Sequence, residues 1–205
     1  MSSIDNLATL FTKFPGIGTR QAKRFVYFLL AQNPRFLDTL IKEIANLQSE
    51  IMQCNLCFRF FPREYTNVSC QICRDESDSS VLLIVEKDSD FENIHRSGSF
   101  QGKYFVLGGS VPVLEQNPAS RIRIHELIER IEKGIPEGLT EVIFALSANP
   151  EGDYTQEYII KILSLRLKNS EIKITALGRG LSTGSELEYS DSETLRFALK
   201  NRSEQ

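Results

Sequence analysis

The chain has 205 residues, 41% of them apolar and 25% charged, the composition of a globular protein with one large domain or two to three small ones. No apolar run approaches the roughly 20 residues that a membrane-spanning helix needs. The first residues lack the basic and apolar regions of a signal peptide. We therefore expect a cytoplasmic protein with reduced thiols and no membrane partner. The net charge of −3 gives no indication of nucleic-acid binding.

The charge is unevenly distributed along the chain. Residues 1–35 contain one acidic side chain, Asp5, and five basic ones: Lys13, Arg20, Lys23, Arg24 and Arg35. This segment has a net charge of +4, so the rest of the chain must carry −7 to give the total of −3. A basic segment on an acidic body is an asymmetry that the function has to explain.

Apolar residues at the spacing of an amphipathic helix form three runs near the start of the chain. The first run ends at Pro15-Gly16-Ile17-Gly18. The second ends near Asn33-Pro34, because proline disfavours helix in the residue before it. We expect helices over residues 4–14, 22–30 and 37–51.

The glycine corner between the first two helices has the features of an anion site. Gly16 and Gly18 permit a tight turn that leaves backbone N–H groups uncovered at the start of the next helix. Arg20 and Arg24 are four residues apart on that helix, with Lys23 beside them. Together these groups would hold a nucleic-acid backbone without reading its bases. The alternative is a plain corner between helices with solvated charges.

All four cysteines of the chain form two Cys-x-x-Cys pairs: Cys54 and Cys57, then Cys70 and Cys73. This spacing predicts one structural Zn²⁺ per chain in a tetrahedral thiolate site, which has no open position for catalysis. The alternatives are disulfides, which need an oxidising compartment, and a redox Cys-x-x-Cys, which does not usually occur twice.

The second half of the chain alternates between strands and helices. Continuous apolar runs at 81–85, 104–107, 142–146 and 172–177 predict strands buried on both faces, and helical stripes at 124–131 and 158–163 lie between them. This order predicts a parallel sheet with right-handed crossovers over residues 79–177. The remaining residues contain a Gly/Ser-rich stretch and a short helix with Leu195 and Leu199.

Carboxylates follow the first and third predicted strands: Glu86, Asp88, Glu151 and Asp153. The carboxyl ends of parallel strands form the functional crevice of such sheets. The four acids therefore form a candidate cluster for Mg²⁺ and phosphoryl-transfer chemistry. The alternative is a solvated surface or a docking face for a basic partner protein.

Residues 14–25, Phe-Pro-Gly-Ile-Gly-Thr-Arg-Gln-Ala-Lys-Arg-Phe, resemble the helix-hairpin-helix of the RecR family of bacterial recombination mediators. Glu151-Gly-Asp-Tyr-Thr155 is similar to the family's Glu-Gly-Glu-x-Thr, and Gly180 to Asp191 is similar to its Walker-B-like segment. The resemblance extends from about residue 5 to residue 202. It implies a multidomain α/β fold with four parts: a helix-hairpin-helix DNA-binding domain (1–53), a Cys₄ zinc finger (54–78), a Toprim domain (79–177) and a C-terminal segment (178–205).

The resemblance also implies a function. Family members are non-enzymatic mediators of recombinational DNA repair that bind DNA through basic hairpin residues, which match Arg20 and Arg24. They work with RecO and RecF and close into ring-shaped tetramers. The chain departs from the family pattern at Ser110–Pro118, which lacks the usual glycines, and at Thr175-Ala176, where an arginine is usual. Two other functions stay open: a Mg²⁺-dependent Toprim nuclease or nucleotidyl transferase, and a zinc-containing protein–protein adaptor.

Overall fold

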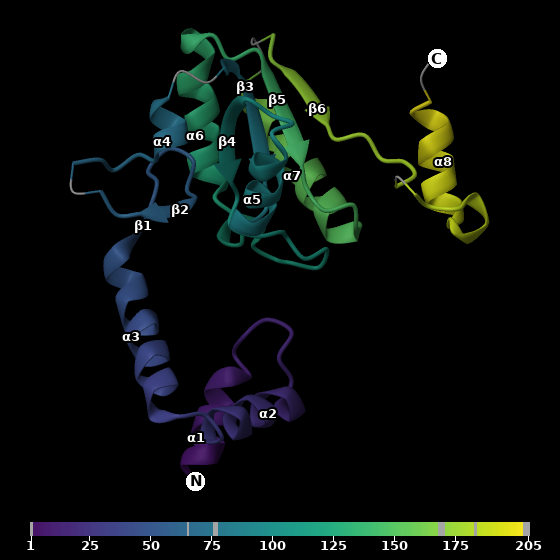
Figure 1. Cartoon of the computed structure of the whole chain (residues 1–205). Coiled ribbons are helices and arrows are strands. Elements are labelled where there is room, and N and C mark those ends of the chain that lie inside the picture. Colours follow the sequence, from purple (N-terminus) through teal and green to yellow (C-terminus); the bar gives the residue numbers. More distant parts are fainter. Residues whose placement is uncertain (1, 65, 76–77, 168–170, 183, 203–205) are drawn as a thin grey trace. The chain divides into compact units, whose positions relative to one another are not determined.

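The computed structural model describes residues 2–64, 66–75, 78–167, 171–182 and 184–202. The chain divides into two compact units, Met1–Met52 and Gln53–Gln205, each of which is described by itself. Figure 1 shows the elements of each unit in sequence colours.

The first unit is helical, as the sequence predicts. Ser2 caps the first helix in a capping box with Asp5. Asn33 caps the third helix, whose first residue is Pro34. The helices are α1 (Ser3–Phe11), α2 (Thr19–Leu30) and α3 (Pro34–Glu50).

Helices α1 and α2 form the small core of this unit. Ala8, Ala22 and Val26 are buried between them, and the rings of Phe11 and Phe25 meet edge to face at 5.7 Å. Helix α3 has no buried residue. Its predicted apolar stripe is exposed instead, with Ile41, Ile44 and Leu47 at 66%, 60% and 58% exposure.

The cysteine segment forms a small module at the start of the second unit. Strand β1 (Ile51–Gln53) spans the boundary between the units and forms a two-stranded sheet with β2 (Phe60–Pro62). The one-turn helix α4 (Gln71–Arg74) contains the last cysteine. The sequence patterns did not indicate these strands, because three residues are too few to show a period.

A four-stranded parallel sheet forms the body of the second unit, which confirms the predicted α/β fold. The strands β3 (Asp78–Val85), β4 (Gly102–Val106), β5 (Glu141–Ala145) and β6 (Lys173–Ala176) lie in the order β4-β3-β5-β6. Helices α6 (Ile124–Gly134) and α7 (Pro150–Arg166) cover one face, and α5 (Asp88–Ser97) covers the other (Figure 1).

Burial explains the continuous apolar runs of these strands. Leu82, Ile84 and Phe105 pack toward α6 and α7, whereas Leu83, Val85 and Tyr104 pack with Phe91 of α5. Both faces of the central strands are therefore covered, as parallel sheets require.

The C-terminal segment ends in helix α8 (Ser192–Lys200), which confirms the predicted short helix. Asp191 caps it by accepting hydrogen bonds from the N–H groups of Glu193 and Thr194, both at 2.9 Å. Short 3₁₀ turns lie at Pro118–Ser120, Ile135–Glu137 and Leu187–Tyr189. None of the helices in the described ranges has the length and apolar character needed to cross a bilayer.

Candidate functional site

The glycine corner of the first unit presents an open helix start. Gly16 has a φ of +74°, a conformation that favours glycine. Gly18 is the N-cap of α2, makes no side-chain cap bond, and a Cβ at either glycine would meet nothing within 4 Å. Since the first-turn N–H groups of a helix lack intrahelical partners, the start of α2 faces solvent as an electropositive surface.

The basic residues of α2 add side-chain charge to this surface. Arg20, Lys23 and Arg24 are exposed. Arg24 donates a hydrogen bond of 3.3 Å to the neutral side chain of Gln21. No salt bridge neutralises these three cations within the part of the chain that the structure describes. Their charge is therefore available to an anionic ligand.

The structure brings the four cysteines together. Their sulfur atoms all lie within 4.8 Å of one another, and Cys54, Cys57 and Cys70 are buried. The Sγ atoms of Cys54 and Cys73 are 3.9 Å apart, and those of Cys57 and Cys70 are 3.6 Å apart. Tetrahedral zinc with Zn–S bonds of about 2.3 Å places its sulfurs about 3.8 Å apart. The donor set and its spacing therefore fit Zn²⁺.

Backbone hydrogen bonds orient the sulfurs. The N–H groups of Leu56 and Cys70 donate to Cys54 Sγ at 3.4 and 3.3 Å. Hydrogen bonds from the neighbouring thiols, Cys57 first, hold the pKa of Cys54 well below its usual range. Hydrogen bonds within the cluster, those of Cys54 first, raise the pKa of Cys57 and of Cys73. The crowded thiols therefore share their protons, and a divalent cation can take the place of those protons.

Two of the predicted acidic residues accept hydrogen bonds from backbone N–H groups. Glu86 is only 3% exposed and accepts a hydrogen bond of 2.7 Å from the N–H of Ser147, at the end of β5. Asp88 accepts a hydrogen bond of 2.7 Å from the N–H of Phe60, on β2 of the cysteine module. Asp88 therefore joins α5 to that module.

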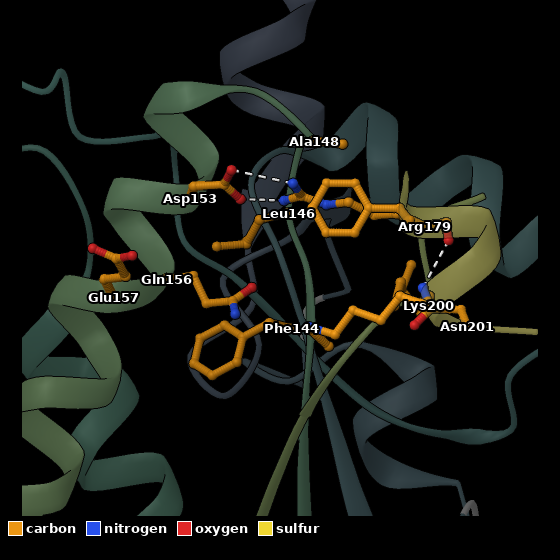
Figure 2. Close-up of a pocket in the computed structure, with 13 residues that line it drawn as sticks. Phe144, Leu146, Ala148, Asp153, Gln156, Glu157, Arg179, Lys200 and Asn201 are labelled. Atoms are coloured by element: carbon orange, nitrogen blue, oxygen red, sulfur yellow. Dashed lines mark hydrogen bonds and ion pairs between the residues drawn. The ribbon is translucent and has the colours of Figure 1, made fainter. Parts of the chain in front are cut away.

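Asp153 forms an ion pair with Arg179, which follows β6 (Figure 2). A cavity of about 750 Å³ opens beside this pair, between α7, β5 and α8. Figure 2 shows Asp153, Gln156 and Glu157 on the α7 side and Lys200 and Asn201 on the α8 side. The chain thus supplies its own cation to one of the predicted acids.

The fourth acid, Glu151, is exposed and accepts a hydrogen bond of 3.4 Å from Ser110 Oγ. Among the described residues, the cysteines are the only group of three or more potential ligands with donor atoms within 4.8 Å of one another. The acids therefore have separate partners. Arg179 was not identified from the sequence, because its partner lies 26 residues away and no motif joins them.

Comparisons with known families agree with this architecture. The Toprim domain family matches residues 80–178, and the family described as RecR, C-terminal matches residues 180–203. Recombination protein RecR of Treponema denticola is 36% identical to the chain, over 98% of both proteins.

The chain belongs to the RecR family. Two other recombination proteins named RecR support this assignment. The protein of Bdellovibrio bacteriovorus is 32% identical over all of this chain and 98% of its own length. The protein of Mycobacterium leprae is 33% identical over 97% of this chain and 96% of its own length. The predicted family is therefore confirmed, and with it a role in recombinational DNA repair. The roles of the individual site residues and the domain bounds stay predictions.

Proposed function

We propose that this RecR-family protein is a non-enzymatic mediator that binds the DNA backbone through its glycine corner. The observation that carries the proposal is the start of α2, where uncapped N–H groups lie beside exposed Arg20, Lys23 and Arg24. Backbone donors and cations of this kind bind phosphates and carry no base information. The binding is therefore sequence-independent.

A salt titration tests this mechanism. Each phosphate contact releases counterions, so the logarithm of the affinity falls with the logarithm of salt concentration with a slope of about −0.9 per contact on duplex DNA. We expect a slope of about −2 or steeper for each bound chain. An affinity that is unchanged between low and moderate salt rules out a phosphate-based site.

We assign Zn²⁺ to the four cysteines as a structural ion. Cys54, Cys57, Cys70 and Cys73 would hold it, and it would cross-link a module with little apolar core of its own. Four ligand thiolates fit a protein of the reducing cytoplasm. Elemental analysis should give one zinc per chain, and strong chelation should unfold residues 54–73. Protein purified without chelators and lacking zinc contradicts this assignment.

The proposal excludes catalysis by the predicted acidic residues. Glu86 is buried against a backbone N–H, and Asp153 is neutralised by Arg179. A Mg²⁺ site needs carboxylates that converge and are free to bind metal. Incubating labelled DNA with the protein and Mg²⁺ or Mn²⁺ should give no cleavage. Metal-dependent cleavage that Glu86→Gln abolishes favours the nuclease alternative.

We further propose a ring-shaped tetramer that works with RecO and RecF. Apolar side chains remain exposed on α3, and in the C-terminal segment Leu187, Tyr189 and Leu199 are 63%, 81% and 66% exposed. Such surfaces mark contacts with other chains. A ring would gather the basic corners on one surface and leave acidic residues such as Glu151 for partner proteins. Light scattering should give a four-chain mass; a monomer at all concentrations argues against the ring.

A further inference from the structure

Strand β4 contacts both cysteine pairs of the module. The N–H of Val106 donates a hydrogen bond of 2.8 Å to the carbonyl of Cys57. The ammonium of Lys103 donates to the carbonyl of Cys73 at 3.3 Å. In each Cys-x-x-Cys pair, the backbone of the second cysteine is therefore fixed by the same strand.

Lys103 is an unusual residue for this position. It is only 8% exposed, and its ammonium also donates to the carbonyls of Asp75 at 2.7 Å and Ile72 at 3.2 Å. These bonds use all three of its donors, but they supply no negative charge. Lys103 has no carboxylate partner among the described residues. A buried cation without an anion is costly, so the site needs a negative group nearby.

Arg59 is a second cation at the cluster. The carbonyl of Arg59 accepts a hydrogen bond of 2.9 Å from the N–H of Cys54. Its guanidinium lies 4.9 Å from the centre of the Phe91 ring and favours the thiolate form of Cys70. Its Nε is buried and has no hydrogen-bond partner in the described part of the chain. Arg59 and Lys103 approach different cysteines, so they act on the cluster from two positions.

The charge of a zinc–thiolate cluster is opposite in sign to the charges of Lys103 and Arg59. Zn²⁺ with four thiolates carries a net charge of −2, and the two cations carry +2. We infer that Lys103 and Arg59 are positioning residues that neutralise the zinc–thiolate cluster and determine how firmly it holds the metal. This inference rests on the proposed assignment of Zn²⁺ to the cysteines.

Removal of either cation should leave excess negative charge on the sulfurs, and removal of Lys103 should also free the backbone carbonyl of Cys73. Groups around the ligands typically contribute about 10- to 100-fold to metal affinity. Lys103→Met keeps the length of the side chain and removes its charge and hydrogen bonds, whereas Lys103→Arg keeps the charge. Lys133→Met is the matched control, because Lys133 is exposed on the same unit and pairs with Glu129 across one helical turn.

The experiment measures the zinc content of each full-length variant and the rate of zinc transfer to an excess of a chromogenic chelator. We expect Lys103→Met and Arg59→Met to release zinc about 10-fold or more faster than the parent. Lys103→Arg and Lys133→Met should stay within a few-fold. With Co²⁺ in place of zinc, the thiolate-to-metal charge-transfer band should move to lower energy in both methionine variants, which a loss of packing alone would not cause.

The outcomes separate the two proposals. A parent chain without zinc overturns both the zinc assignment and this inference. A parent with one zinc per chain, and methionine variants that release it at the parental rate with an unchanged Co²⁺ band, overturns this inference alone. If Lys103→Met does not fold, Lys103→Arg and Arg59→Met still decide: equal release from Arg59→Met and the parent contradicts the inference.

Discussion

The guanidinium of Arg179 and the carboxylate of Asp153 form a bidentate pair, in which Nη1 of Arg179 lies 3.1 Å from Oδ2 of Asp153. Arg179 also lies 5.3 Å from the ring centre of Phe197 on α8, and its carbonyl accepts a 2.7 Å hydrogen bond from Asn201. One residue therefore connects the start of α7 to the C-terminal helix.

Arg179→Ala should release α8 from α7. We expect faster amide exchange over residues 192–200. The global unfolding free energy should change by no more than about 1 kcal/mol, because both partners of the ion pair are partly exposed. Arg196→Ala is the control, since the partners of Arg196, Glu193 and Phe197, lie within α8 itself. Equal exchange in the two variants would contradict the role assigned to Arg179.

Two substitutions of Gly18 can separate an effect on helix stability from an effect on phosphate binding. A side chain here has open space, and Gly18→Ser and Gly18→Asp each supply the missing N-cap, which stabilises helices by about a few tenths of a kcal/mol relative to glycine. Only the aspartate places a negative charge where the phosphate is expected. Gly18→Asp should therefore bind DNA more weakly than Gly18→Ser at similar thermal stability. Equal DNA affinities of the two variants would exclude the helix start as the phosphate site.

Thr155 explains the last position of the Glu-Gly-Asp-Tyr-Thr motif. Its side chain is fully buried, accepts a 2.8 Å hydrogen bond from the N–H of Val111, and donates to the carbonyl of Glu151 at 2.6 Å. Thr155→Val leaves the Val111 N–H unpaired and should cost about 1–3 kcal/mol in denaturant unfolding. Thr155→Ser keeps both hydrogen bonds and should cost less. The reverse order of stability would be inconsistent with these contacts.

The helix cap formed by Asp191 should make the stability of α8 depend on pH. Hydrogen bonds from the side chain and N–H of Thr194 lower the pKa of Asp191 below its unfolded value of 3.8. Because the folded pKa is the lower one, the cap contributes fully above the unfolded pKa and is lost as pH falls through the folded pKa. Amide exchange of α8, corrected for intrinsic rates, should increase in that acidic window in the parent and change less in Asp191→Asn. The same acid response in both would show that another group is responsible.

Local patterns in the sequence were sufficient for most elements of the fold. The apolar runs at 81–85 and 142–146 become central strands because both sheet faces are covered by helices. Helix α5 was missed, since Phe91 is its only buried residue and the others give no clear stripe. The predicted stripe of α3 forms a helix, but no residue of this helix is buried, and Ile41, Ile44 and Leu47 are exposed.

The candidate sites differ in how much the sequence specifies. The cysteine cluster follows from spacing alone, because two tight pairs leave little freedom in how the sulfurs meet. Glu86 directly follows β3, whereas Glu151 and Asp153 lie in the first turn of α7, and the sequence did not reveal the partners of these acids. Asp88 accepts a hydrogen bond from the N–H of Phe60, Glu86 accepts one from the N–H of Ser147, and Asp153 forms an ion pair with Arg179. These partners are distant in the sequence and come together only when the chain folds.

The DNA affinity of Arg20→Ala/Arg24→Ala tests the central claim most directly. Lys87→Ala/Arg96→Ala is the matched control, since both of its residues are exposed and the change in net charge is the same. Loss of two phosphate contacts should weaken binding to every DNA sequence and reduce the salt slope by about 2, whereas the control should bind as the parent does. An Arg20/Arg24 variant with the parental affinity and salt slope would contradict a DNA site at the glycine corner.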